Sequence, residues 1–197
     1  VNAIEVSPHD PATVYIATTR YKWGDKTPAL YKSTNYGKSW KNISEGIPMG
    51  AYTRVVREDQ SRKDLLFAGT ELGVYISWNG GQAWEPFQLN LPVTPINDLM
   101  VHQNDLVVAT SGRSFWILDN LNLLAQYEES GKAQVYQPED LVYGSWGSAL
   151  NSNSADGTSD FEGVNPANGV VLYYELPKME DDEELTLEIT NEKGELI

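Results

Sequence analysis

The sequence predicts an all-β chain built from repeated four-stranded units. The segment STNYGKSW at residues 33–40 recurs 44 residues later as SWNGGQAW at residues 77–84. Short runs of β-branched and aromatic residues, separated by turn residues, surround each copy. A repeat of about 40–45 residues with four short strands is typical of β-propeller blades. We therefore expect about three blades of a partial β-propeller.

Each copy of the repeated motif is expected to close a β-hairpin. The Asn can accept a hydrogen bond from a backbone N–H two residues on, the Gly can adopt a positive φ, and the Ser hydroxyl can hold the strand end. A buried Trp removes about 150–250 Å² from water, worth several kcal/mol at ~25 cal/mol per Å². The motif is thus interpreted as a structural element, and its residues are Ser33, Asn35, Gly37, Trp40, Ser77, Asn79, Gly81 and Trp84.

The strands are expected in three groups along the chain. The first unit, residues 1–48, holds strands at 3–6, 14–18, 29–33 and 40–43. The second, residues 51–92, holds strands at 53–57, 65–70, 73–77 and 84–87. The third, residues 95–127, keeps strands at 96–102, 106–110 and 114–118. In place of a third hairpin motif, residues 119–124 predict a capped helical turn.

The two motifs resemble the Asp-box, the repeat of BNR and sortilin-type β-propellers. Both copies carry Asn where that family has Asp, which keeps the acceptor oxygen and removes the charge. DLVVATSGRSFWILDNL at 105–121 and VYQPEDL at 135–141 resemble the closing blade of bacterial sortilin-like propellers of the BNR-repeat glycosyl hydrolase type. NPANGVVLYYEL at 165–176 resembles the segment leading into a small β-sandwich. The resemblance implies propeller blades over 1–143, a linker over 144–163 and the start of a sandwich over 164–197.

Composition narrows the classes of partner. With 28 acidic and 14 basic residues the formal net charge is −14, which argues against binding nucleic acid or an anionic membrane surface. The chain has no cysteine, so disulfide and thiolate chemistry are excluded. No apolar run approaches the ~18 residues of a membrane span. A glycan or a peptide is the expected partner, no cofactor is predicted, and a bacterial envelope or secreted location is expected from the resemblance.

A propeller closes with about four to eight blades, and three are visible here. We therefore expect the sequence to be a piece of a longer chain. Unpaired strands at the ends of a partial propeller invite pairing. Self-association through exposed blade edges follows as an expectation.

The sequence contains few residues that could form a metal site or a catalytic nucleophile. The two histidines, His9 and His102, offer almost no material for a metal site or a Ser–His–Asp arrangement. The segment 151–163 contains Asp156, Asp160 and Glu162, which could bind calcium, but it lacks the EF-hand spacing. A solvated linker is the favoured interpretation, and no metal site is predicted.

The candidate ligand-binding residues are Arg20, Glu71 and Arg113. Each stands just after the second strand of its unit, and corresponding loops of successive blades open on one rim of the disc, so the three are expected on one face. The leading hypothesis is a non-catalytic propeller segment that binds a glycan or peptide there. The alternative is part of a sialidase-like glycoside hydrolase whose catalytic blades lie outside this chain, and pure scaffolding is a third. Whether the protein is an enzyme, and through which residues, stays open.

Overall fold

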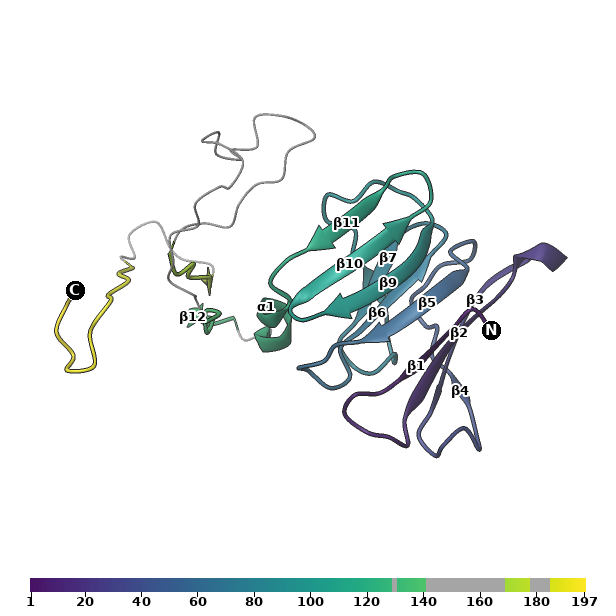
Figure 1. Cartoon of the computed structure of the whole chain (residues 1–197), viewed down its shortest axis with the longest axis horizontal. Coiled ribbons are helices and arrows are strands. Elements are labelled where there is room, and N and C mark those ends of the chain that lie inside the picture. Colours follow the sequence, from purple (N-terminus) through teal and green to yellow (C-terminus); the bar gives the residue numbers. More distant parts are fainter. Residues whose placement is uncertain (129–130, 141–168, 178–184) are drawn as a thin grey trace, which may run out of the picture. The chain divides into compact units, whose positions relative to one another are not determined.

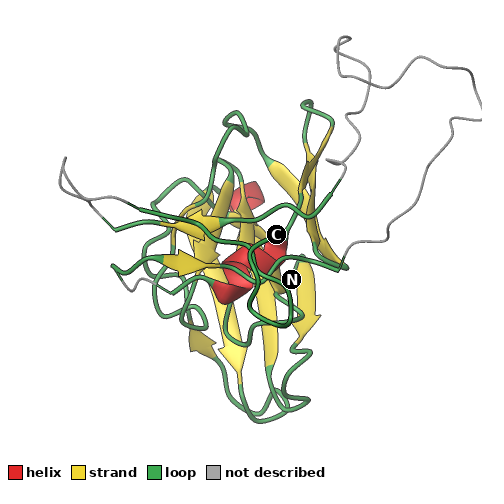
Figure 2. Ribbon diagram, turned by 90° about the vertical axis from the view of Figure 1, so that its left-hand side faces the viewer, coloured by secondary structure: helices red, strands yellow, loops and turns green. Residues whose placement is uncertain are grey.

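The chain consists almost wholly of antiparallel β-structure. A computed structural model describes residues 1–128, 131–140, 169–177 and 185–197. It divides into two compact units, Val1–Tyr127 and Glu128–Ile197. Within the described residues, helix is confined to the 3₁₀ turn η1 (Tyr21–Trp23) and the short helix α1 (Leu121–Gln126), drawn red in Figure 2. None of the helices in these residues is long and apolar enough to cross a membrane. The all-β prediction is confirmed.

The first unit is a partial β-propeller of three consecutive sheets (Figure 1). Blade 1 has the order β1-β2-β3-β4, with strands β1 (Ala3–Val6), β2 (Val14–Arg20), β3 (Asp25–Ser33) and β4 (Lys41–Asn42). Blade 2 has the order β5-β6-β7-β8, with strands β5 (Thr53–Glu58), β6 (Leu66–Thr70), β7 (Val74–Ser77) and β8 (Glu85–Pro86). Blade 3 has three strands in the order β11-β10-β9, namely β9 (Ile96–His102), β10 (Asp105–Thr110) and β11 (Phe115–Leu118).

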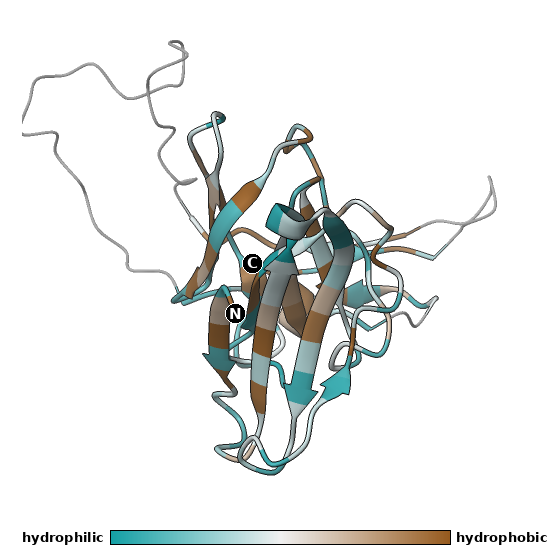
Figure 3. Ribbon diagram, turned by 90° about the vertical axis from the view of Figure 1, so that its right-hand side faces the viewer, coloured by the Kyte–Doolittle hydropathy of each residue, from teal (hydrophilic) through white to brown (hydrophobic). Residues whose placement is uncertain are grey.

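Blade 2 is buried on both faces because it lies between the other two blades. Its apolar run at 65–68 divides residue by residue: Leu66 and Ala68 face the core shared with blade 1, and Leu65 and Phe67 face the core shared with blade 3. A continuous apolar run is expected of a strand covered on both sides. The period-2 alternation visible as brown and teal bands in Figure 3 marks strands with one covered face.

The outer faces of blades 1 and 3 remain open to solvent. On blade 1, Ile4 and Val6 point outward from β1, and on blade 3, Phe115 and Ile117 point outward from β11. The first strands of the three blades, β1, β5 and β9, lie side by side in sequence order. In a propeller this places them toward the axis around which the blades are arranged.

Both copies of the repeated motif close their hairpins with the same pair of hydrogen bonds from backbone N–H groups. The Gly37 N–H donates to the Ser33 hydroxyl and the Gly81 N–H to the Ser77 hydroxyl, each at 2.9 Å. Gly37 and Gly81 adopt φ of 78° and 86°, as expected. The Asn carbonyls accept backbone N–H groups four residues on, from Ser39 at 2.9 Å and Ala83 at 3.0 Å, whereas the sequence analysis expected a donor two residues on. The longer reach lets one side chain span the whole turn.

The two tryptophans of these motifs differ in burial. Trp84 is 5% exposed and belongs to the core between blades 1 and 2, but Trp40 is 42% exposed. Among the described residues, Trp84 thus packs between two blades and Trp40 does not. Trp84 lies against the end of blade 1, where its indole N–H donates to the Ile43 carbonyl at 2.6 Å. Within the described residues, no blade stands in the corresponding place beside Trp40.

The predicted helical turn after β11 is present as α1, and it buries Leu121 in the core between blades 2 and 3. Its N-terminus is held from another element. Asn104, in the turn between β9 and β10, accepts the Leu121 N–H through its backbone carbonyl at 2.7 Å and the Asn122 N–H through its side chain at 2.8 Å. The capping side chain is thus supplied by tertiary structure rather than by the residues that precede the helix.

The second unit pairs segments that are distant in sequence. Strand β12 (Gln134–Val135) is antiparallel to β13 (Tyr174–Glu175). Residues 191–194 form a turn, in which the Gly194 N–H donates to the Asn191 carbonyl at 2.9 Å, and Thr190 forms a bridge with Leu196. The predicted linker at 144–163, with Asp156, Asp160 and Glu162, lies outside the described residues. The start of a sandwich over 164–197 stays a prediction.

Candidate functional site

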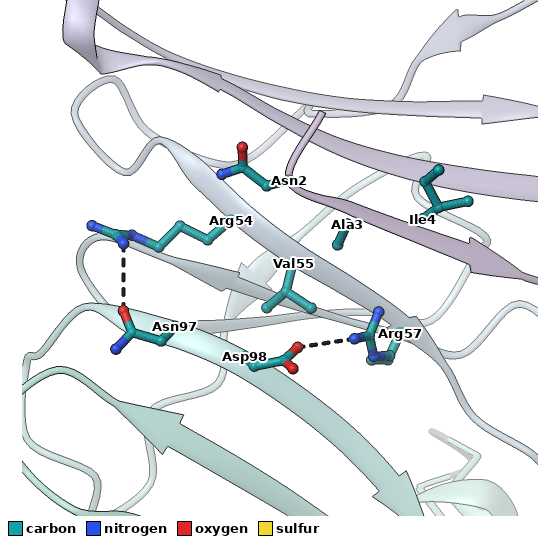
Figure 4. A pocket seen from close by; sticks show the side chains of 8 residues that line it. All are labelled: Asn2, Ala3, Ile4, Arg54, Val55, Arg57, Asn97 and Asp98. Carbon is teal, nitrogen blue, oxygen red and sulfur yellow. Dashed lines mark hydrogen bonds and ion pairs between the residues drawn. The ribbon is translucent and has the colours of Figure 1, made fainter.

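A polar pocket of about 240 Å³ opens between the first strands of the three blades. It is shown in Figure 4, and its lining residues are Asn2, Ala3, Ile4, Arg54, Val55, Arg57, Asn97 and Asp98. They come from β1 and the residue before it, from β5, and from β9. Charged side chains in the axial strand of a buried blade are unusual, because a charge leaves water only when it is paired. We refer to this site as the Arg54–Arg57 pocket.

Arg57 contacts three residues, one in blade 1 and two in blade 3. Its guanidinium lies 2.9 Å from an Asp98 carboxylate oxygen, 3.5 Å from a Glu5 carboxylate oxygen and 2.7 Å from the Leu99 carbonyl. Its side chain is 20% exposed. Arg57 therefore links all three blades at the wall of the pocket. Burial raises the pKa of Glu5 even though the positive charge of Arg57 opposes that shift.

Arg54 joins the pocket to a group of aromatic side chains. Its guanidinium forms an ion pair with Glu71, in the turn between β6 and β7, and lies 3.4 Å from the Asn97 side-chain oxygen. It lies over the ring of Tyr52, 5.5 Å from the ring centroid, and Tyr52 stacks on Tyr21 with centroids 5.1 Å apart. Burial alone would lower the pKa of Arg54, but its hydrogen bonds with Glu71 and Tyr52 raise it overall.

The charges around the pocket are balanced within the protein. The two arginines face three carboxylates, those of Glu5, Glu71 and Asp98. A receptor for an anionic ligand keeps a guanidinium available for bidentate pairing, whereas here both guanidinium groups already pair with carboxylates. The pocket therefore offers many hydrogen-bond donors and acceptors, with three carboxylates against two guanidinium groups.

The excursion between β2 and β3 exposes two aromatic side chains, and one of them, Tyr21, lies beside Arg54. Tyr21 is 41% exposed and Trp23 is 81% exposed, and both belong to η1, the excursion between β2 and β3. Gly24 ends this turn with φ of 77°, a left-handed conformation that glycine adopts without steric cost. Tyr21 also lies 6.0 Å from the Arg54 guanidinium, measured from the ring centroid. The aromatic excursion and the polar pocket thus share Arg54.

Of the three predicted site residues, only Glu71 contacts a residue that lines this pocket. Glu71 pairs with Arg54, as described. Arg20, at the end of β2, forms an ion pair of 2.7 Å with Asp25 and immediately precedes Tyr21. Arg113 lies in the turn between β10 and β11, where its backbone N–H donates to Thr110 and its carbonyl accepts the Trp116 indole N–H at 2.8 Å.

Arg54 and Arg57 lie in strand β5 and not in a loop, so reasoning from loop positions missed them. The signal was present in the segment TRVVRE at residues 53–58, where two arginines three residues apart interrupt an apolar strand. Among the residues that the structure describes, no group of three or more histidines or carboxylates is placed to hold a metal ion. The segment 151–163 is not among them.

No protein-family model and no curated protein matches the chain. Among solved structures, it is similar to the GH74 enzyme of Niastella koreensis, with 19% identity over 60% of this chain and 21% of that chain, at a TM-score of 0.48. It is also similar to YCF48 bound to D1 peptide, with 16% identity over 60% of this chain and 36% of that chain, at a TM-score of 0.43. For YCF48 from Cyanidioschyzon merolae the values are 17% identity, 59% of this chain, 39% of that chain and a TM-score of 0.42. The chain thus spans about a fifth of the GH74 enzyme and less than two fifths of either YCF48 structure.

Proposed function

We propose that this chain is a non-catalytic binding segment of an Asp-box propeller of the BNR and sortilin-like type, and that the Arg54–Arg57 pocket binds a neutral glycan. The observation that carries the proposal is the position of Arg54. One guanidinium contacts the polar pocket on one side and the stacked Tyr21–Tyr52 pair on the other.

The polar half of the site suits hydroxyl groups. A sugar hydroxyl is both a donor and an acceptor, so it needs acceptors and donors close together. The paired guanidinium and carboxylate groups provide both, and the amides of Asn2 and Asn97 add two more side chains of dual character. A carboxylate-bearing ligand would have to displace Glu71 or Asp98 from its arginine, and displacement of Glu71 leaves a partly buried carboxylate unpaired.

The aromatic half suits the apolar face of a sugar ring. Exposed aromatic rings combine a large apolar surface with few rotatable bonds, so they bind at a low cost in conformational entropy. Trp23, at 81% exposed, has more free ring surface than Tyr21. Binding sites of this kind combine an apolar surface with a few placed polar groups.

Titration with a panel of neutral oligosaccharides, followed by amide chemical shifts, tests the proposal. Trp23→Ala and Arg54→Gln should each weaken binding at least tenfold. Tyr36→Ala is the matched control, because Tyr36 is also an exposed aromatic residue, at 71%, but lies in the first Asp-box turn. Binding that survives both site substitutions would overturn the proposal, as would binding of peptides and not glycans. Release of new reducing ends from a bound glycan would favour the glycoside hydrolase alternative instead.

A further inference from the structure

The two copies of the repeated motif differ in the residue that follows the asparagine. Asn35 is followed by Tyr36, and Asn79 is followed by Gly80. The backbone is alike in both copies, since Tyr36 has φ of 59° and Gly80 has φ of 69°. The N–H of each also donates to a carbonyl in the turn between the first two strands of its blade, at 3.0 Å for Tyr36 and 2.8 Å for Gly80. A difference in chemistry between the two asparagines therefore comes from side chains.

An asparagine followed by glycine is open to a reaction that other asparagines undergo slowly. The backbone nitrogen of the following residue attacks the side-chain carbonyl carbon, and a side chain on that residue hinders the attack. The amide group that leaves also differs between the copies. The Asn35 amide donates to the Ser39 hydroxyl at 2.8 Å, whereas Ala83 replaces this serine in the second copy. Within the described residues the Asn79 amide nitrogen donates no hydrogen bond, and Asn79 is exposed to water.

From these differences we propose that Asn79 is a site of spontaneous deamidation, and that the contact of blade 1 with this turn sets the rate. The Gly80 nitrogen bonds to Cγ of Asn79, and its proton passes by way of water to the amide nitrogen. The bond from Cγ to that nitrogen breaks, and ammonia leaves. Water then opens the five-membered imide that remains. Opening at one carbonyl yields aspartate, and opening at the other yields isoaspartate.

The folded chain restrains the attacking nitrogen. The Gly80 N–H is buried and donates to the Asp64 carbonyl. The Asp64 side chain forms an ion pair of 2.9 Å with Lys32 of blade 1, and this pair lies over Gly80. A Cβ added to Gly80 would be 2.8 Å from Lys32 Nζ and closer still to an Asp64 carboxylate oxygen, so the ion pair requires glycine here. The reaction therefore proceeds only through the population of molecules in which this covering contact is open.

The two products affect the motif differently. The side-chain oxygen of Asn79 accepts the Ser77 hydroxyl and the Ala83 N–H, each at 3.0 Å. An aspartate keeps both acceptors and adds a negative charge. Isoaspartate adds an atom to the main chain of the turn that precedes Trp84, whose ring belongs to the core between blades 1 and 2. Formation of isoaspartate therefore weakens the contact between blades that restrained the reaction.

Peptide mapping by mass spectrometry, after incubation of the 197-residue chain at mildly alkaline pH, tests the proposal. The map separates Asn79 from the chain's other Asn-Gly pair, at residues 168–169. The reference for an unrestrained turn is a synthetic peptide of residues 75–84, YISWNGGQAW. We expect Asn79 in the chain to react at least tenfold more slowly than in the peptide and at least tenfold faster than Asn35. Equal rates in chain and peptide, or a rate at Asn79 no faster than at Asn35, would each overturn the proposal.

Lys32→Met and Lys38→Met are matched variants, because each removes one lysine charge and only Lys32 pairs with Asp64. Lys32→Met should speed deamidation of Asn79 by about twofold to fivefold, the range expected for a partly exposed ion pair. Lys38→Met should leave the rate unchanged, and circular dichroism should show both variants folded like the wild type. The same rate in both variants would mean that blade 1 does not restrain the reaction.

Tyr36→Gly tests the chemistry in the other copy. It places an Asn-Gly pair in the first motif, where no blade covers the turn within the described residues. Asn35 should then react at least tenfold faster than it does in the wild-type chain. An Asn35 whose rate is not raised by Tyr36→Gly would show that the residue after the asparagine does not determine reactivity in this turn, and the assignment of Asn79 would be wrong.

Discussion

The two copies of the repeated motif share their main internal hydrogen bonds but have opposite environments. In both, a serine hydroxyl accepts a glycine N–H and an asparagine carbonyl spans the turn. Yet Trp84 is 5% exposed and Trp40 is 42% exposed. The turn is therefore determined by local sequence, and the burial of the tryptophan is determined by whether a neighbouring blade is present. The motif alone does not carry the stabilising energy that its tryptophan can contribute.

The largest expected difference between the two motifs lies in their tryptophans. Trp84→Ala removes a buried ring from the core between blades 1 and 2 and should lower the free energy of unfolding by about 3–5 kcal/mol. Trp40→Ala removes a ring that is already half in solvent and should cost about 1 kcal/mol. Urea denaturation of both variants measures the difference. Equal losses would mean that Trp40 is buried in solution, most directly by a second copy of the chain.

The next largest difference in stability is expected between alanine substitutions at the glycines of the two motifs. Both have positive φ, so alanine costs roughly 1–2 kcal/mol at either position. At Gly81 the added Cβ would also lie 2.5 Å from the Ile43 side chain, whereas at Gly37 its nearest neighbour is the Trp40 ring at 3.6 Å. Overpacking adds about 1–3 kcal/mol, so Gly81→Ala should lower the denaturation midpoint clearly more than Gly37→Ala. Equal effects would indicate that Ile43 moves aside without cost.

The asparagines should differ little, because the one additional bond of Asn35, from its amide to the Ser39 hydroxyl at 2.8 Å, is exposed to solvent. Asn35 and Asn79 each accept one serine hydroxyl and one backbone N–H at closely similar distances. Replacement by alanine should cost about 1 kcal/mol in each case through the lost turn hydrogen bonds. Replacement by aspartate keeps both acceptors and should cost less than alanine. A large difference between Asn35→Ala and Asn79→Ala in thermal unfolding would contradict the view that the turn is purely local.

Sequence reasoning succeeded where one strand or one turn determines the outcome. The period-2 runs located the strands of all three blades, and the polar segment after β11 located α1. Sequence reasoning failed where a residue distant in the sequence determines the contact. The N-terminus of α1 is held by Asn104, sixteen residues from Asn120, and β12 pairs with a strand about forty residues later. No local pattern marks such partners.

In the candidate site, too, positions set by local sequence could be predicted and contacts between distant residues could not. The position of Glu71 after a second strand is visible in the sequence, but its partner Arg54 lies in a different strand, and the approach of Tyr21 from blade 1 depends on how the blades stack. Arg57 illustrates this most directly, because its three partners come from β1 and β9. The sequence shows that charged residues interrupt an apolar strand. It does not show which residues of the neighbouring blades pair with them.

The smallest expected effects come from Glu71 and Arg113, which lie in the turns between the second and third strands of blades 2 and 3. Glu71→Gln removes the carboxylate that pairs with Arg54, whose side chain is 25% exposed. A charge-assisted hydrogen bond is worth roughly 1.5–3 kcal/mol, but partial exposure screens it, so we expect a loss of about 1 kcal/mol. Arg113→Ala should change stability by no more than about 0.5 kcal/mol, because its structural contacts are made by its backbone. In thermal unfolding, ~1 kcal/mol corresponds to about 2–4 °C for a chain of this size. The Tm of Glu71→Gln should therefore fall by that amount, and the Tm of Arg113→Ala should stay within one or two degrees of wild type.

Glycan binding should weaken in Glu71→Gln, since Arg54 loses its fixed position, and should be unchanged in Arg113→Ala. The reverse result, with binding lost only in Arg113→Ala, would move the ligand site from the Arg54–Arg57 pocket to the turn between β10 and β11.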